Sequence, residues 1–315
     1  MKNAQKIDYS IVIPVFCNQG TLKKTHKVIQ DEIIQYNKSK SYELIFIDDG
    51  SYDSSFEELM QLKKQYPENI KIIKFTRNFG QISAILAGYQ YTRGKCIINI
   101  SADLQEPPEL VNEMLNYHYK DNYDIVIGTR DSRDESFFRS KTSNIFYRII
   151  KKLIFPNMPK GGFDSVLISD KVKKVVLNEN DSNPFWQGQI LWTGYKIKFI
   201  PYKRKKREVG KSKWTFSKKL KYLIDGVMSY SYFPLRTMSI TGLIISLLGF
   251  IYAVVILFAR IFGKVQIYGW TPIMILILVL SGIQMLMIGV IGEYLWRTLD
   301  QVRNRQKYII EKIYD

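Results

Sequence analysis

Two long uncharged segments near the C-terminal end constrain this chain more than any other feature. Residues 237–259 are 23 consecutive residues without a formal charge, and residues 265–292 are 28 more. A helix needs about 20 apolar residues to cross the hydrocarbon of a bilayer. Two buried helices of a large soluble protein are the alternative, but such helices rarely run this long without a charge. The sequence therefore predicts two membrane-spanning helices, at about residues 237–260 and 268–294.

The link between these segments is so short that the two helices form a hairpin, and both outer ends then lie on one side of the membrane. Basic residues flank those outer ends: Arg236, Arg297 and the cluster at residues 203–207. The positive-inside rule places that side in the cytoplasm. Arg260 and Lys264 on the far side are a minor counter-signal. We also expect Glu293 to pair with Arg297 four residues later on the same helix.

Basic residues concentrate just before the first span. The chain carries a formal net charge of +17, and residues 196–221 hold 12 Lys and Arg against one acid, Glu208. Such a run is typical of a solvated face, of nucleic-acid binding or of an anionic membrane surface. The membrane is favoured, because the run adjoins the spans and no motif that reads nucleic acid is present. We expect an interfacial helix within residues 216–235, anchored by aromatic side chains: Trp214, Tyr222, Tyr230, Tyr232 and Phe233.

The first 130 residues alternate apolar runs with amphipathic stretches. Runs rich in Ile and Val, separated by helices, indicate βαβ units and an α/β fold with a mostly parallel sheet covered on both faces. Ligands of such sheets bind beyond the carboxyl ends of the strands. The predicted strands are 10–15, 43–49, 70–75, 95–101 and 123–129, and the predicted helices are 21–38, 54–66, one from 81 and one after 108.

Two carboxylates and a Gly-Ser turn end the second predicted strand, at Asp48, Asp49, Gly50 and Ser51. Carboxylates accept hydrogen bonds from the ring N–H groups or ribose hydroxyls of a nucleoside. The alternative is a helix cap built on Ser51 or Asp53. By itself this motif is only suggestive of a nucleoside site.

The fourth predicted strand ends in Ser101-Ala102-Asp103-Leu104-Gln105-Glu106-Pro107-Pro108. A carboxylate leaving a buried strand, with an amide oxygen two residues on, can hold a hard divalent cation that shares its shell with substrate phosphates. The alternative is a cap before a helix that begins at proline.

In their order along the chain, these segments closely resemble family 2 glycosyltransferases of the GT-A fold, and most of all those that act on dolichyl and polyprenyl phosphates. The resemblance runs from Tyr9 to Ile310, and its later motifs resemble bactoprenol glucosyltransferases with two transmembrane helices. The motifs are a Pro-Val turn after the first strand, DDGS at 48–51, RNFG at 77–80, ADLQ-x-PPE at 102–109, GTR at 128–130, RxxGxSK at 207–213, GEYL at 292–295 and RNRQKYII at 303–310.

The resemblance implies roles for individual residues. Asp103 and Gln105 would hold Mg2+ or Mn2+ on the donor diphosphate, and Asp164 would orient the acceptor or the sugar, a structural turn being the alternative for Asp164. The residues implied around the nucleotide sugar are Pro14, Val15, Asp48, Asp49, Ser51, Asn78, Gly80 and Asp103. Those implied on the lipid phosphate are Arg130, Arg139, Ser143, Arg207, Lys211 and Lys213.

The implied activity is the inverting transfer of one sugar from a nucleotide sugar to undecaprenyl phosphate at the cytoplasmic face of a bacterial inner membrane. UDP-glucose is the favoured donor, with UDP-N-acetylglucosamine, UDP-galactose and GDP-mannose left open. A processive polysaccharide synthase is disfavoured, because such enzymes carry more spans and a Q-x-x-R-W motif. A catalytically silent scaffold that binds nucleotide sugar is the alternative from another class.

The chain departs from the family pattern at three places. Ser101 stands where the family usually has Asp, the first loop lacks its usual acid, and Gln81 stands where Lys or His is common. The loss of a carboxylate at position 101 lowers the charge that faces a metal.

Four segments are expected. They are a cytoplasmic GT-A catalytic domain at 1–215, an interfacial helix at 216–235, the two spans within 236–296 and a cytoplasmic basic tail at 297–315. We expect a homo-oligomer, with a tetramer plausible from the resemblance, and no nucleic-acid partner.

Overall fold

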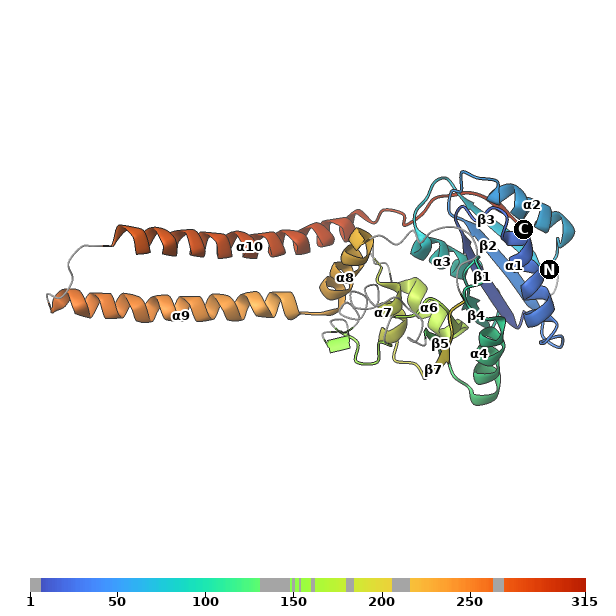
Figure 1. Ribbon diagram of the computed structural model, residues 1–315, viewed down its shortest axis with the longest axis horizontal. Coiled ribbons are helices and arrows are strands. Elements are labelled where there is room, and N and C mark those ends of the chain that lie inside the picture. Colours follow the sequence, from blue (N-terminus) through green and yellow to red (C-terminus); the bar gives the residue numbers. More distant parts are fainter. Residues whose placement is uncertain are drawn as a thin grey trace.

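An α/β unit with two long projecting helices makes up the molecule (Figure 1). The computed structural model describes residues 7–130, 148, 151–152, 154–159, 162–179, 184–205, 216–262 and 269–315. The strands are β1 Tyr9–Val15, β2 Tyr42–Asp48, β3 Ile70–Phe75, β4 Cys96–Asn99, β5 Ile125–Arg130, β6 Val166–Ser169, β7 Ile197–Tyr202 and β8 Ile310–Tyr314.

The strands form one sheet in the order β7-β5-β6-β4-β1-β2-β3-β8. The pairs β1–β2, β1–β4, β2–β3 and β5–β7 are parallel, whereas β4–β6, β5–β6 and β3–β8 are antiparallel. The prediction of an α/β fold with a mixed, mostly parallel sheet is therefore confirmed. Because β6 runs against its neighbours, its first residues lie at the same edge as the last residues of the parallel strands.

Helices cover both faces of the sheet, and each face carries its own hydrophobic core. Along β1, Ile11 and Ile13 belong to one core while Val12 belongs to the other, as the two-residue period of a strand requires. Burial of an aliphatic side chain of this kind stabilises the fold by roughly 1.5–3 kcal/mol. One core is closed by α1 Leu22–Val28, the π-helix Ile29–Ile34, α2 Ser55–Gln65 and α4 Pro108–Asp121, and the other by α3 Gln81–Gln90, α6 Asp170–Asn178 and α7 Trp186–Trp192.

The predicted single helix over residues 21–38 is two elements in the structure. Helix α1 ends at Val28, and a π-helix continues from Ile29 to Ile34. Its wider turn brings Ile29, Ile33 and Ile34 into the core beside α4. Sequence periodicity cannot detect this change, because an apolar stripe looks similar at both helical periods.

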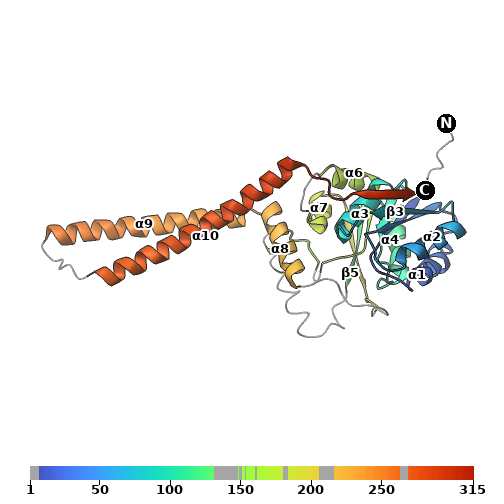
Figure 2. The ribbon, with the colours of Figure 1, turned by 90° about the horizontal axis from the view of Figure 1, so that it is seen from above.

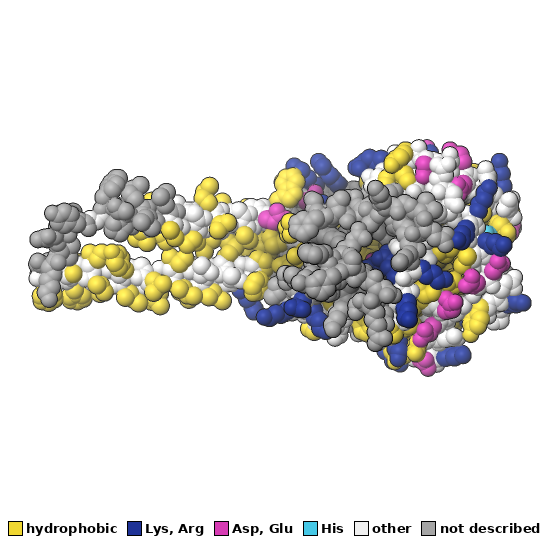
Figure 3. Space-filling model, in the orientation of Figure 1, with side chains coloured by type: hydrophobic (Ala, Val, Ile, Leu, Met, Phe, Trp, Pro, Cys, Tyr) yellow, Lys and Arg dark blue, Asp and Glu magenta, His cyan; other side chains and the backbone are white. Residues whose placement is uncertain are grey.

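Two helices, α9 Phe233–Ile261 and α10 Trp270–Arg303, lie antiparallel and project away from the sheet (Figures 1 and 2). Both are long and apolar enough to cross a membrane, and no part of their most apolar windows is buried. Hydrophobic side chains run along their length, while Lys and Arg side chains gather where the helices meet the α/β unit (Figure 3). A soluble core helix would instead be buried, so the exposure of these helices agrees with the predicted pair of spans.

At the base of this pair lies α8 Phe216–Tyr230, which falls within the expected interfacial segment. Its Tyr222 ring packs 4.7 Å from Phe185, and its Tyr230 ring packs 5.3 Å from Phe155. These ring contacts fix α8 against the α/β unit.

The C-terminal end returns from α10 to the far edge of the sheet (Figure 2). There β8 pairs antiparallel with β3, so that Ile313 lies opposite Ile73 and Lys312 opposite Lys74. The sequence predicts only a basic tail over residues 297–315, and this strand is a difference from that prediction.

Candidate active site

The predicted nucleoside residues meet where β1, β2 and β3 end. The register pairs Pro14 with Ile47 and Val15 with Asp48, so the two motifs end side by side. Asp48 is buried, one of its oxygens accepts from the Ser51 N–H at 3.1 Å, and burial raises the pKa of its carboxyl. Its second oxygen has no partner among the described residues. This inward-facing carboxyl is suited to accept a ligand hydrogen bond.

Asp49 organises the neighbouring loop. Its carboxylate accepts from the Phe79 N–H at 2.7 Å, the Gly80 N–H at 3.0 Å and the Asn78 side-chain amide at 2.9 Å. Burial raises its pKa to about 6, although the backbone N–H groups of Phe79 and Gly80 act in the opposite direction. Asn78 and Gly80 therefore reach the site through Asp49.

Gly50 is the residue type that this junction requires. Its φ is +67°, and a Cβ built on it would lie 2.4 Å from the Arg77 carbonyl carbon. A side chain there would be strained and would push apart the two loops that Asp49 joins.

Side chains from the β2–α2 region hold the first loop by its backbone. Ser51 Oγ accepts from the Cys17 N–H at 3.0 Å, Ser55 Oγ from the Asn18 N–H at 2.8 Å, and Glu58 from the Gly20 N–H at 2.6 Å. Ser51 is thus placed beside the predicted nucleoside site and also shapes the loop opposite it.

The Asp103 loop follows β4, and Leu104 in it adopts the left-handed region with φ +52°. Asp103 Oδ1 lies 3.4 Å from the Gln105 N–H. Glu106, which the sequence analysis did not single out, is buried and accepts from both the N–H and the hydroxyl of Ser101. A buried carboxylate therefore faces position 101, where the family usually supplies its own.

Arg130 and Asp164 come together as an ion pair at the ends of β5 and β6. Arg204 Nη2 lies 3.9 Å from the same carboxylate and also donates to the amide oxygen of Gln105. Sequence reasoning counted Arg204 only as part of the basic run. Arg204 follows β7 by two residues and Asp164 precedes β6 by two residues, and neither of these strands was among those predicted from the sequence.

Buried side-chain amides hold the backbone at Asp164 through hydrogen bonds. The Asn99 amide donates to the Asp164 carbonyl, and the Gln187 amide donates to the Phe163 carbonyl. The Tyr89 hydroxyl donates in turn to Asn99 Oδ1 at 3.0 Å. Asp164 is therefore fixed in place at its backbone, as a structural turn residue would be, while its side chain faces the two arginines.

Five residues predicted on the lipid phosphate lie outside the described residues, so the structure gives them no position: Arg139, Ser143, Arg207, Lys211 and Lys213. In the part of the chain that is described, no group of three or more His, Cys, Asp or Glu side chains is arranged to hold a metal. A cation at Asp103 would therefore take most of its ligands from substrate and water.

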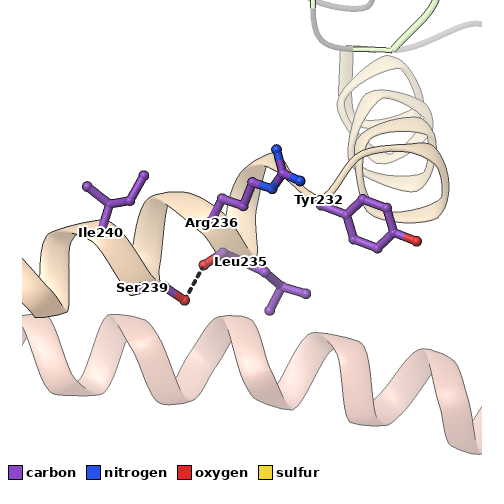
Figure 4. A pocket seen from close by; sticks show the side chains of 5 residues that line it. All are labelled: Tyr232, Leu235, Arg236, Ser239 and Ile240. Atoms are coloured by element: carbon purple, nitrogen blue, oxygen red, sulfur yellow. Dashed lines mark hydrogen bonds between the residues drawn. The ribbon is translucent and has the colours of Figure 1, made fainter.

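A cavity of about 400 Å³ lies at the base of α9 (Figure 4). Arg236 is the one charged residue in its lining, and Ser239 Oγ donates to the Leu235 carbonyl at 3.0 Å. Its lining comes from the start of α9 and from Tyr232 just before that helix, so it is separate from the carboxylates and arginines at the strand ends. The lining residues are Tyr232, Leu235, Arg236, Ser239 and Ile240.

Comparison with known proteins gives a consistent result. The model of the family "Glycosyl transferase family 2" matches residues 10–175. The Bacillus subtilis (strain 168) uncharacterized glycosyltransferase YkcC is 36% identical over 312 residues, covering 99% of this chain and 95% of its own. The prophage bactoprenol glucosyl transferase homolog of Escherichia coli (strain K12) is 33% identical over 308 residues, covering 96% of this chain and 98% of its own.

A phage protein and a solved structure extend the comparison. The bactoprenol glucosyl transferase of Shigella phage SfII is 32% identical over 305 residues, covering 96% of this chain and 97% of its own. Glucosyl-3-phosphoglycerate synthase from Mycobacterium tuberculosis superposes with a TM-score of 0.48 at 12% identity, covering 70% of this chain and 79% of its own.

Proposed function

Because this chain belongs to glycosyl transferase family 2, and is therefore a GT-A-like transferase, we propose that it moves one sugar from a nucleotide sugar to a polyprenyl phosphate. Undecaprenyl phosphate is the proposed acceptor and UDP-glucose the first donor to test. The observation that carries the proposal is the row of groups along one sheet edge, with carboxylates at β2, Asp103 at β4 and the arginines beyond. Two relatives named as bactoprenol glucosyl transferases, similar over nearly their full length, support the choice of acceptor.

The donor would lie across the ends of β1 to β4. The buried Asp48 carboxyl and the loop held by Asp49 would take the nucleoside. Asp103, at the next strand end, would then lie near the diphosphate.

The Asp103 loop fits a divalent cation in part. Asp103 offers a carboxylate, which suits Mg2+ or Mn2+ when substrate phosphates complete the shell. The Gln105 amide oxygen accepts from Arg204, so Gln105 would have to release Arg204 before it could join that shell. A bound cation would offset the charge on the departing nucleotide.

The nucleophile would be a phosphate oxygen of the acceptor, which is already ionised near neutral pH, so no strong general base is demanded. That oxygen forms a bond to the anomeric carbon while the bond from that carbon to the diphosphate breaks, and the leaving diphosphate keeps the electron pair. Attack from the opposite side inverts the anomeric centre. Arg130 would hold the acceptor phosphate, since a planar guanidinium matches phosphate oxygens.

The helices α9 and α10 would bring the lipid to this site. With both helices in the bilayer, α8 would lie at the interface, and the α/β unit and both chain ends would face the cytoplasm, as the basic flanks predict. The Arg236 cavity would then lie at headgroup depth.

Transfer of label in detergent tests this function. Purified protein is given undecaprenyl phosphate and a panel of labelled nucleotide sugars, with Mg2+, Mn2+ or EDTA. We expect label to enter the lipid phase from one donor and the transfer to stop with EDTA. Nucleotide binding without transfer from any donor would favour the silent scaffold, for which Ser101 is the argument.

The variant Asp103→Ala tests the role of Asp103 in this transfer. We expect it to lower transfer by about 100-fold or more, because charge on the leaving diphosphate is no longer offset. Glu109→Ala, on the first turn of α4, is the control for loss of a nearby exposed carboxylate. Full activity in Asp103→Ala would remove Asp103 from the site.

A further inference from the structure

Among the described residues, two arginines and one aspartate form a charged cluster at the ends of β5, β6 and β7. Arg130 and Arg204 face the single carboxylate of Asp164. We propose that Arg204 binds the acceptor phosphate together with Arg130, and that the Asp164 carboxylate holds the place of that phosphate until the acceptor arrives. This inference rests on the function proposed above and names a binding residue that the sequence motifs do not.

The sheet register explains why these groups meet. Arg130 lies opposite Tyr202 in the β5–β7 pair, so Arg204 follows two residues beyond the same edge. Val166 lies opposite both Asn99 and Ile127, and this places Asp164 just beyond the ends of β4 and β5. The three charged groups therefore come together from strands that are adjacent in the sheet.

Both arginines keep donors to spare. The side chains of Arg130 and Arg204 are only 21% and 31% exposed, and the Nε atom of each is buried without an acceptor among the described residues. A buried donor without an acceptor costs free energy that a ligand oxygen would recover. One carboxylate cannot satisfy two guanidinium groups, whereas a phosphate has enough oxygens for both.

Tyr202 adds a third donor. Its hydroxyl is buried without a partner in the described part of the chain. Burial raises its pKa, and the nearby Glu106 carboxylate acts in the same direction, so the hydroxyl keeps its proton near neutral pH. A neutral hydroxyl beside two arginines can donate to an anion but cannot repel it.

The placement of Asp164 makes it a suitable stand-in. Its carbonyl and that of Phe163 are held by Asn99 and Gln187, so the backbone stays in position when the side chain turns. The Asp164 side chain is 36% exposed, which leaves room for that rotation. An incoming phosphate would therefore replace one anion with another, without leaving two arginines unpaired at any step.

Strand order assigns the phosphate to the acceptor rather than to the donor. The groups proposed for the nucleoside belong to β1, β2 and β3, and Asp103 follows β4. The two arginines and Asp164 lie farther along the edge, on β5, β6 and β7. The sugar would then lie between Asp103 and the arginines, with the attacking phosphate on the far side of it.

Equilibrium binding to the full-length protein in detergent tests the proposal without requiring turnover. Farnesyl phosphate is the acceptor probe and UDP is the donor probe. We expect Arg204→Gln to lower the affinity for farnesyl phosphate by at least about tenfold, as for loss of a charge-assisted hydrogen bond. The affinity for UDP should fall by less than about twofold. Arg204→Lys should recover part of the loss, because it keeps the charge without the planar fork.

Lys203→Gln is the matched control, since it removes an exposed positive charge from the adjacent position. Its affinities for farnesyl phosphate and for UDP should stay within about twofold of the wild-type values, because a screened surface charge contributes little to binding. Asp164→Asn should raise the affinity for farnesyl phosphate by about threefold or more, since the carboxylate that competes with the phosphate is gone.

Unchanged UDP binding in each variant also shows that the protein is folded. Weakening of UDP rather than farnesyl phosphate by Arg204→Gln would place Arg204 on the donor and overturn the proposal. Weaker farnesyl phosphate binding in Asp164→Asn would overturn the stand-in role. If the wild type binds farnesyl phosphate as expected but transfers no sugar, the proposed reaction fails while the phosphate site stands.

Discussion

At the scale of single residues, Asp49 shows how one buried carboxylate can build a site. The Asp49 carboxylate is buried away from water. Three donors from the β3–α3 loop stabilise it there by hydrogen bonding to its oxygens. Its counterpart Asp48 keeps one oxygen unused among the described residues. The two adjacent acids of the motif therefore differ in their surroundings: both oxygens of Asp49 are engaged by the β3–α3 loop, whereas Asp48 has one buried oxygen that the described residues do not engage.

The raised pKa of Asp49 makes stability depend on pH. Its folded pKa is about 6, against an ordinary value of 3.8 for an aspartate carboxyl, so the folded protein binds the proton more tightly than the unfolded chain does. Stability from this group is complete below about pH 4 and is lost as the pH rises through about 6. We expect the free energy of unfolding of the wild type, relative to Asp49→Asn, to fall by roughly 2–3 kcal/mol across that window.

Urea unfolding of both proteins at pH 4, 5, 6 and 7 measures this difference. The same comparison with Asp53→Asn, in the next turn, is the control, because the pKa of Asp53 is lowered rather than raised. A wild-type-minus-variant difference that stays constant with pH would contradict the assignment.

At the scale of elements, one arginine joins α10 to α8, at the base of the two projecting helices. Arg297 of α10 donates to Asp225 of α8 at 2.7 Å and to Glu293 of its own helix at 2.9 Å. The expected pairing of Glu293 with Arg297 is therefore confirmed, and Asp225 is a partner that the sequence did not reveal. The side chains of Arg297 and Asp225 are only 17% and 11% exposed, so water screens the pair weakly.

Arg297→Met should destabilise the protein by about 1–3 kcal/mol, because Asp225 would remain as a nearly buried charge without this partner. Thermal unfolding in one detergent, followed by circular dichroism, measures the effect. Arg303→Met is the control: Arg303 is exposed and its guanidinium lies over the Trp296 ring, 5.7 Å from the ring centroid, so its loss should cost no more than about 1 kcal/mol. Equal losses of thermal stability in the two variants would argue against a stabilising role for the Arg297–Asp225 ion pair.

At the scale of the whole molecule, the chain closes on itself. After leaving α10, it crosses to the far side of the α/β unit and adds β8 to the edge of the sheet, where an unpaired β3 would otherwise be exposed (Figure 2). Tyr308 stacks on Phe75 with ring centroids 5.1 Å apart and donates its hydroxyl to Gln90. The sheet is therefore tied to α9 and α10 through α8 at one side and through β8 at the other.

Tyr308→Ala should lower the free energy of unfolding by roughly 2–3 kcal/mol, because it removes both the ring contact and the hydrogen bond. Tyr308→Phe keeps the ring and should cost about 0.5–1.5 kcal/mol. Limited proteolysis should then release the C-terminal segment from the alanine variant first. Resistance equal to that of the wild type would show that β8 does not depend on this contact.

Much of the architecture followed from local patterns. The strands from 9 to 130 lie within one or two residues of their predicted positions at most ends, because apolar β-branched runs bounded by polar turns have few other solutions. The two apolar helices were also predictable from the sequence, since a helix of that length and composition fits only a bilayer or a large hydrophobic core. The π-helix and β8 were not predicted, because neither has a local signal that differs from an ordinary helix or tail.

The sequence by itself determined which chemical groups the protein has, and it placed most of them at strand ends, where an α/β sheet binds ligands. Only the tertiary structure decided which of those groups act together. Arg204 belongs to a basic run in the sequence, but the pairing of β5 with β7 brings it to Asp164 and Gln105. The reason is physical: a strand's own residues fix where it ends, whereas its neighbours in the sheet are chosen by packing between segments far apart in the chain.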